Sequence, residues 1–219
     1  MSGNTSCPTF DVNKFRPEHC RACGSRLVDH SRESVTESQL VAYLDYQCGK
    51  EPVHEILPGK EGGFGGFYLG SRMACSTKWV DQLGVRHIFQ TARALEDFYP
   101  PLGRTLKAHE ANGVQVYRLG WVDDSSFVIE DFETPLRGIH TARTRGEAVL
   151  VNCAQGKSRS TTLVVAYVMC VEGQNVADTV GFVQSKRSIA QPNPGFIAQL
   201  ETFAQSDVCA KLKREFGSS

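Results

Sequence analysis

Neither sign of charge is in excess in this sequence, whose 219 residues hold 24 Lys and Arg against 24 Asp and Glu. A net charge of zero argues against broad electrostatic binding to nucleic acid or anionic lipid. A long hydrophobic run is also missing, because the longest, Leu163 to Val171, is far short of the ~20 residues that cross a bilayer. We therefore expect no nucleic acid partner and no membrane span.

A secretory signal is absent as well, since Met1 to Phe10 is polar. We expect a cytoplasmic protein, with the nucleus as the alternative location. A disulfide framework is not expected there, so the eight cysteines favour metal binding, catalysis or core packing. Cys170 lies within an apolar run and is predicted to pack in the core, and Cys75 and Cys209 receive the same interpretation.

Composition divides the chain into three parts. Residues 1–60 are polar, with several prolines and four of the cysteines. Pro58 to Gly66 contains five glycines and is predicted to be a hinge or linker. Residues 61–206 carry alternating strand-like and helix-like segments and are predicted to form one domain. Residues 207–219, with the charged run Lys211 to Glu215, are predicted to be a solvated tail.

The first part contains a cluster of cysteines and a histidine. Cys20 and Cys23 form a CxxC pair, with Cys7 upstream and His30 downstream, a spacing compatible with a tetrahedral zinc site. Cys48 is a second choice for the fourth ligand. A closed site of this kind is structural or presents a surface to a partner. Free thiols and a redox pair are the alternatives for these cysteines.

Residues 61–206 have the pattern of an α/β domain, with a central, mostly parallel sheet flanked by helices. The predicted strands are Phe67 to Leu69, Val85 to Gln90, Val114 to Trp121 and Ala148 to Cys153. The predicted helices are Ala74 to Leu83, Phe127 to Arg143, Ser160 to Val171, one that includes Val176, Val180 and Val183, and one that starts at Pro194. Ala94 to Asn112 is a long polar passage, and Asn193 is predicted as the N-cap of the last helix.

A cysteine stands where the most apolar predicted strand meets a core helix. Cys153 then lies at a helix N-terminus, where the macrodipole and free backbone N–H groups favour a thiolate. Inward N–H groups of the loop form a nest for a phosphate, and Gly156 permits the backbone conformation this needs. Arg159 can hold two phosphate oxygens, and Ser160 can donate to the sulfur. The predicted phosphate-binding residues are Ala154, Gln155, Gly156, Lys157, Ser158 and Arg159.

This loop resembles the signature of the cysteine-dependent protein phosphatases, and its Gly-Lys-Ser-Arg-Ser ending is similar to the dual-specificity branch. The resemblance covers about residues 64 to 206, from Tyr68-Leu69-Gly70-Ser71 to Pro192-Asn193-Pro194-Gly195-Phe196. It implies a small protein-tyrosine-phosphatase-like fold and a phosphocysteine intermediate on Cys153. Arg159 would clamp the phosphate and Ser160 would assist hydrolysis, with no cofactor for catalysis. The cysteine and histidine cluster near the N-terminus resembles a short element appended to various signalling proteins.

The same family supplies an Asp as general acid from a loop roughly thirty residues before the cysteine. Asp123 and Asp124 stand in that place, and Asp123 fits the family pattern better by its distance to Phe127 and Ile129. The other carboxylate would belong to an acidic turn or a helix start.

One position departs from the family pattern. Asn152 precedes the cysteine where the family usually has His, so we expect a higher pKa of Cys153 and reduced activity. Lys157 is the one lysine of the loop, and the Asn-Arg-Tyr tripeptide of tyrosine-only enzymes is absent. Both features favour phosphoprotein substrates carrying phosphotyrosine and phosphoserine or phosphothreonine. Arg187 is predicted either to contact a second phosphate at the pocket rim or to complement a helix dipole.

Two other functions remain open at the level of sequence. Because of Asn152, the chain is alternatively a catalytically impaired module that binds phosphoproteins. It is also alternatively a phosphatase of a non-protein substrate, a phosphoinositide or a phosphoglucan.

Overall fold

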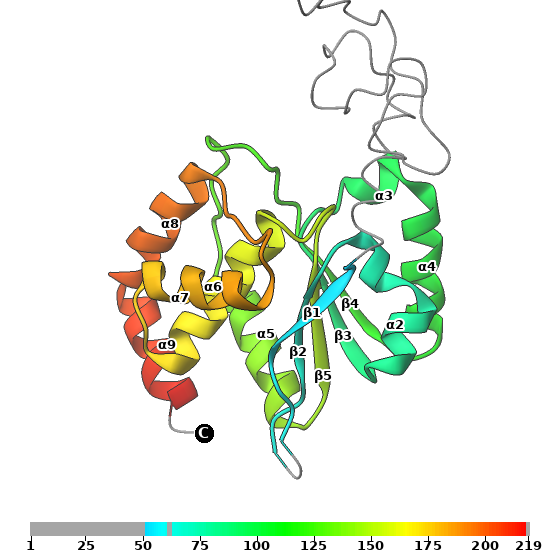
Figure 1. Cartoon of the computed structure of the whole chain (residues 1–219), viewed down its shortest axis with the longest axis horizontal. Helices are drawn as coiled ribbons and strands as arrows, with labels where there is room; N and C mark the ends of the chain where they lie inside the picture. Colours follow the sequence, from blue (N-terminus) through cyan, green and yellow to red (C-terminus); the bar gives the residue numbers. More distant parts are fainter. Residues whose placement is uncertain (1–50, 61–62, 218–219) are drawn as a thin grey trace, which may run out of the picture. The chain divides into compact units, whose positions relative to one another are not determined.

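A five-stranded sheet in the order β1-β2-β5-β3-β4 lies at the centre of the computed structural model (Figure 1), which describes residues 51–60 and 63–217. Its strands are β1 (Val53–Leu57), β2 (Phe67–Gly70), β3 (Val85–Gln90), β4 (Gln115–Arg118) and β5 (Ala148–Asn152). β1 pairs with β2 in antiparallel fashion, and the other neighbours are parallel. The prediction of a mostly parallel sheet is confirmed.

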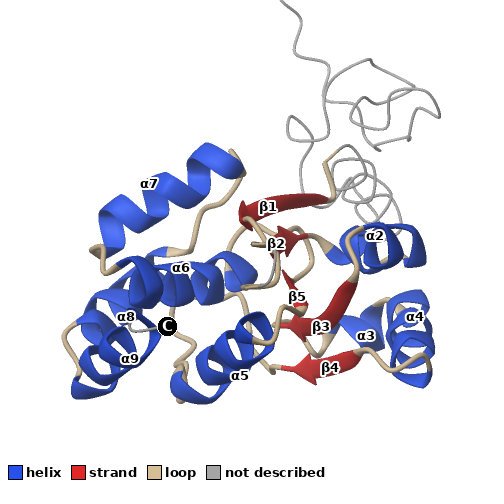
Figure 2. Cartoon of the chain, turned by 90° about the horizontal axis from the view of Figure 1, so that it is seen from below, coloured by secondary structure: helices blue, strands red, loops and turns tan. Residues whose placement is uncertain are grey.

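Helices cover both faces of this sheet. Figure 2 shows α2, α3 and α4 on one face and α5 and α6 on the other, with α7, α8 and α9 packed around α6. The bounds are η3 (Arg72–Cys75, a 3-10 turn), α2 (Thr77–Gln82), α3 (Leu95–Phe98), α4 (Pro100–Ala111), α5 (Glu133–Thr144), α6 (Arg159–Glu172), α7 (Val176–Lys186), α8 (Pro194–Ala204) and α9 (Asp207–Gly217). Across the residues that the structure describes, none of these helices has the length and hydrophobicity to cross a membrane.

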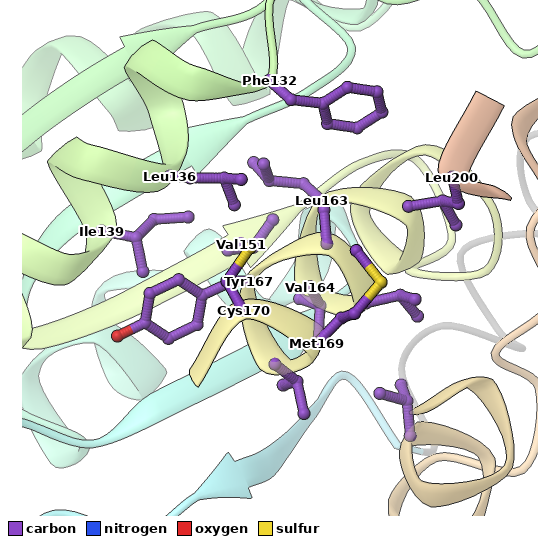
Figure 3. Close-up of a cluster of buried hydrophobic side chains, with 14 of the residues drawn as sticks. Phe132, Leu136, Ile139, Val151, Leu163, Val164, Tyr167, Met169, Cys170 and Leu200 are labelled. Carbon is purple, nitrogen blue, oxygen red and sulfur yellow. The ribbon is translucent and has the colours of Figure 1, made fainter. Parts of the chain in front are cut away.

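β5 is buried on both faces because alternate side chains point to opposite sides of a strand. Val149 and Val151 join the hydrophobic cluster under α5 and α6, and Leu150 joins the smaller cluster under α2 and α4. Helix α6 is buried nearly all round, as its apolar sequence predicts. Figure 3 shows its residues Leu163 and Tyr167 beside residues of α5, α8 and β5.

Four predicted segments have different bounds in the structure. The predicted helix of residues 74–83 is broken at Ser76 into η3 and α2. The polar passage of residues 94–112 contains α3 and α4, since α4 buries Leu102 and Leu106 on one face. The predicted strand of residues 114–121 is only the four residues of β4. Helix α5 starts at Glu133 rather than at residue 127. At this start the Asp131 carboxylate accepts a hydrogen bond from the Thr134 backbone N–H at 3.0 Å.

Two predictions about domain limits are wrong. Residues 58–66 are the connection of a β-hairpin, because β1 pairs directly with β2 on either side of it. They are therefore no linker between domains, and the compact unit begins at Pro52 rather than at residue 61. Within the predicted tail of residues 207–219, Asp207–Gly217 form α9, which packs against α6 and buries Cys209, Leu212 and Phe216. The charged residues of the run Lys211 to Glu215 lie on the turns of α9 between these buried side chains.

Candidate active site

The loop of residues 153–158 joins the end of β5 to the start of α6. Cys153 is the first residue after the strand, and 2% of its surface is exposed. Gly156 has φ +68°, and an added Cβ would lie 2.6 Å from the backbone of Gly70. Both the conformation and the lack of space therefore require glycine at this position, as the sequence predicts.

Several donors surround the Cys153 sulfur. The Gly156 backbone N–H donates to Sγ at 3.2 Å, and the Ser160 hydroxyl donates to it at 3.1 Å. Burial alone would raise the pKa of this thiol. The positive charge of Arg159, the Ser160 hydrogen bonds and the Lys157 backbone N–H outweigh burial, so the pKa of Cys153 lies below its ordinary value. The predicted interaction of Ser160 with the sulfur is confirmed.

Arg159 is the first residue of α6 and lies beside the same loop. Its Nε is buried and makes no hydrogen bond within the described part of the chain. The Asp123 carboxylate forms an ion pair with it, with Oδ2 at 3.6 Å from that nitrogen. A buried guanidinium nitrogen without a hydrogen bond is available to an oxygen of a bound anion.

Asp123 faces the loop, whereas Asp124 does not. The Oδ1 of Asp123 accepts hydrogen bonds from the Ser158 hydroxyl at 2.6 Å and from Asn193 Nδ2 at 3.1 Å. Asp124 is exposed and accepts hydrogen bonds from the Ser126 hydroxyl and backbone N–H, which lower the pKa of its carboxyl group. The geometry therefore favours Asp123 over Asp124 as a group that acts at the site.

Asn193 links this acidic loop to α8. It is the N-cap of α8, with its Oδ1 accepting from the Phe196 backbone N–H at 2.9 Å, as the sequence predicts. Its Nδ2 holds the Asp123 carboxylate at the same time. This second contact is not evident in the sequence, because the two residues are 70 positions apart.

Asn152 is fully buried directly before the cysteine. Its carbonyl accepts hydrogen bonds from the backbone N–H and hydroxyl of Thr91. Its side-chain Oδ1 and Nδ2 have no hydrogen-bond partner in the described structure. The amide therefore gives the Cys153 sulfur no charge and no hydrogen bond.

Arg187 does not lie at the pocket rim, so the first of its two predicted roles is wrong, and it lies at the C-terminal end of α7 as the second requires. It follows α7 with 1% of its surface exposed, and it donates to the carbonyls of Gly156 and Gln155. The guanidinium approaches the loop from the side of the carbonyls. A side chain held in this way supports the loop backbone and contacts no second phosphate.

The predicted zinc ligands Cys7, Cys20, Cys23 and His30 lie outside the described residues. Within residues 51–60 and 63–217, no three His, Cys, Asp or Glu side chains form a group that could hold a metal ion. Cys75, Cys170 and Cys209 are buried and free, as predicted for core residues.

The chain is similar to known proteins over the segment that contains this site. A family model described as the dual specificity phosphatase catalytic domain matches residues 67–206. The chain is 36% identical over 147 residues to dual specificity protein phosphatase 1 of Arabidopsis thaliana, covering 64% of this chain and 67% of that protein. It is 43% identical over 91 residues to human dual specificity protein phosphatase 22, covering 40% of this chain and 50% of that protein.

The fold is also similar to that of solved structures of phosphatases and phosphatase-like proteins. The crystal structure of DUSP15 matches with a TM-score of 0.62 and 28% identity, covering 76% of this chain and 95% of that one. A human tyrosine phosphatase-like serine/threonine/tyrosine-interacting protein matches with a TM-score of 0.54 and 25% identity, covering 69% and 94%. The match over residues 67–206 contains Asp123, Cys153, Arg159 and Ser160. This chain belongs to the dual-specificity phosphatase family of protein phosphatases.

Proposed function

We propose that this chain hydrolyses phosphotyrosine and phosphoserine or phosphothreonine in proteins through a phosphocysteine intermediate on Cys153. The observation that carries the proposal is the convergence of three groups on one loop. The Cys153 thiol has a lowered pKa, the Arg159 Nε is available to an anion, and the Asp123 carboxylate lies 3.6 Å from that nitrogen.

The first step transfers the phosphoryl group to sulfur. The Cys153 thiolate attacks phosphorus while the bond from phosphorus to the substrate oxygen breaks. Asp123, in its protonated form, gives its proton to that leaving oxygen. Arg159 and the backbone N–H groups of the loop stabilise the charge on the phosphoryl oxygens in the transition state.

The second step returns the free enzyme. Water attacks the phosphocysteine, and the Asp123 carboxylate takes one of its protons. The bond from phosphorus to Sγ breaks, and the Ser160 hydroxyl, 3.1 Å from that sulfur, stabilises the departing thiolate. Inorganic phosphate then leaves the loop.

Phosphatases of this family are cysteine-based and need no metal for catalysis. The zinc site proposed at Cys7, Cys20, Cys23 and His30 would therefore be structural or would serve a partner. Metal analysis of untreated protein tests it. About one equivalent of zinc is expected, and less than about a tenth of an equivalent would contradict the site.

One observation favours a second function, a module that binds phosphoproteins without turnover. Asn152 places an uncharged, unpartnered amide before the cysteine. One structural match also bears the description of a phosphatase-like interacting protein. Hydrolysis is preferred because Cys153, Arg159 and an acid facing the loop are all present in this chain.

A substrate panel tests the proposed function. The full chain is incubated with peptides carrying phosphotyrosine, phosphothreonine or phosphoserine, with a phosphoinositide and with a phosphoglucan, and released phosphate is measured. The proposal is supported if kcat/KM is highest on the peptides and if the chain hydrolyses both phosphotyrosine and either phosphoserine or phosphothreonine. Preference for the lipid or glucan contradicts it. Binding of phosphopeptide without release of phosphate would favour the binding module.

We also propose a cytoplasmic location and a role in signalling. Four free cysteines among the described residues support a reducing compartment, and Cys170 and Cys209 remain thiols although their sulfurs lie within hydrogen-bonding distance at 4.0 Å. Fractionation of cells that express the chain tests the location. Recovery in the nuclear fraction would favour the alternative.

A further inference from the structure

One buried cation connects β1 to the loop that carries Cys153. The Nε of Arg187 donates to the Gly156 carbonyl at 2.8 Å, and its Nη2 donates to the Gln155 carbonyl at 2.7 Å. Its Nη1 lies 2.8 Å from Nδ1 of His54, which belongs to the edge strand β1. The three nitrogens of one guanidinium therefore contact two loop carbonyls and one strand residue.

The two carbonyls belong to the peptide units whose N–H groups face the sulfur. The Gln155 carbonyl shares a peptide with the Gly156 N–H, which donates to Cys153 Sγ at 3.2 Å. The Gly156 carbonyl shares the next peptide with the Lys157 N–H, which lowers the pKa of the Cys153 thiol. In a planar trans peptide the C=O and N–H point in opposite directions. A donor that holds both carbonyls from behind therefore aims both N–H groups at the sulfur.

His54 is the third partner of the Arg187 guanidinium. A guanidinium has only donors, so the Nδ1 of His54 must accept, and the ring is neutral with its proton on Nε2. Arg187 also has little room to move. A Cβ on Gly156 would lie 3.0 Å from its Nη2, which shows that the guanidinium is in direct contact with the loop backbone. His54 lies before residues 67–206, so this contact comes from outside the segment that the family model matches.

We propose that Arg187 and His54 act as positioning residues, which hold the Cys153 loop in the conformation that binds a phosphate. Neither contacts the reacting atoms, and the role is additional to those of the nucleophile, the clamp and the acid. The inference rests on the proposed function for the identity of the anion.

Equilibrium binding of tungstate, a phosphate-like oxyanion, tests this role without turnover. The full chain is titrated by calorimetry as wild type, Arg187→Lys, His54→Leu and His54→Asn, with thermal unfolding measured on each. Lys keeps the charge but not the fork of donors, so Arg187→Lys is expected to weaken binding about tenfold or more. His54→Leu is expected to weaken it less, in the same direction.

The conservative variant separates positioning from a general loss of stability. An Asn side chain can present its Oδ1 near the place of the histidine Nδ1, so His54→Asn is expected to recover most of the affinity that His54→Leu loses. Glu55→Gln, an exposed change on the same strand, serves as the matched control and is expected to bind like the wild type.

The outcomes are distinct. Arg187→Lys or His54→Leu binding tungstate as tightly as the wild type would overturn the inference, as would a failure of His54→Asn to exceed His54→Leu. The expected order of affinities would support it even if the wild type hydrolysed nothing. A wild type that binds no tungstate would contradict the proposed function and the inference together.

Discussion

Cys75 and Cys153 are both buried, with 0% and 2% of their surfaces exposed, yet their thiols differ in acidity. Burial raises the pKa of Cys75, and the negative charge of Glu96 raises it further. Burial acts in the same direction on Cys153, but the charge of Arg159 and the donors of Ser160 and the loop backbone lower its pKa below the ordinary value. Burial alone makes a thiol inert, and oriented donors around it make a buried thiolate.

The backbone places the two cysteines differently. Cys75 ends the short turn η3, and its carbonyl accepts a hydrogen bond from the His109 ring at 2.8 Å. Its side chain packs in the cluster under α2 and α4. Cys153 follows a parallel strand and precedes a helix of fourteen residues. Backbone N–H groups that a helix start leaves unpaired are therefore available at Cys153.

The largest expected effect is the difference in kcat between a variant of Cys153 and a variant of Cys75. Cys153→Ser removes the nucleophile and should lower kcat on an aryl phosphate by about 10⁴-fold or more. Cys75→Ala removes a packed sulfur and should cost about 1 kcal/mol of stability with little change in kcat. Steady-state kinetics and thermal unfolding check both. Comparable losses of kcat in the two variants would contradict the assignment of Cys153, and not Cys75, as the nucleophile.

Removal of the Asp123 carboxylate tests the surroundings of Cys153 while both thiols stay in place. Asp123→Ala should lower kcat by about 10²-fold or more on a substrate with a poor leaving group, because the leaving oxygen then receives no proton. Asp124→Ala is the matched control, since its carboxylate accepts only from Ser126 in the described structure and it is expected to stay within a few-fold of the wild type. The reverse order would assign the acid to Asp124.

The reactivity of the thiol against pH gives a third measure. Iodoacetamide reacts with the thiolate, so the alkylation rate of Cys153 should rise through its pKa and reach a plateau at a lower pH than an ordinary thiol. Ser160→Ala removes a donor to Sγ and should raise this pKa, which lowers the rate at mildly acidic pH and leaves it unchanged above pH ~9. Rates that superimpose at every pH would show that Ser160 does not stabilise the thiolate.

A smaller effect is expected from Asn152. His at this position can carry a positive charge next to Cys153, so Asn152→His should lower the pKa of the thiol and raise kcat/KM a few-fold. The shift is read from the same alkylation profile, with Asn152→Asp as the control of opposite charge, which should raise the pKa. An unchanged profile for Asn152→His would contradict the expected cost of the native amide.

Sequence pattern predicted those features that depend on neighbouring residues. The order of strand, cysteine, glycine loop and helix lies within residues 148–172, and the Asn193-Pro194 cap lies within a few positions. The period of the apolar residues and the need for glycine at a positive φ are local properties, so they can be read in order along the chain. The contact of Ser160 with the sulfur follows from the same short segment.

Other features escaped sequence analysis because they depend on distant contacts. The charged run in residues 207–217 indicates a tail, and only its packing against α6 shows that Cys209, Leu212 and Phe216 form a buried face. The glycines of residues 58–66 fit a linker as well as a hairpin, and pairing of β1 with β2 decides between them. A buried position for Arg187 cannot be seen in a helix end that is otherwise polar.

The types and spacing of Cys153, Arg159 and Ser160 indicate a phosphate-binding loop with a nucleophile, so the chemistry available at this site can be predicted from the order of the amino acids. The contacts that hold this loop in place are visible only in the folded chain. Asp123 meets Ser158 across 35 positions, and Arg187 joins Gly156 across 31 positions and His54 across 133. These hydrogen bonds join distant residues because the fold places the Asp123 loop, the end of α7 and β1 beside the Cys153 loop.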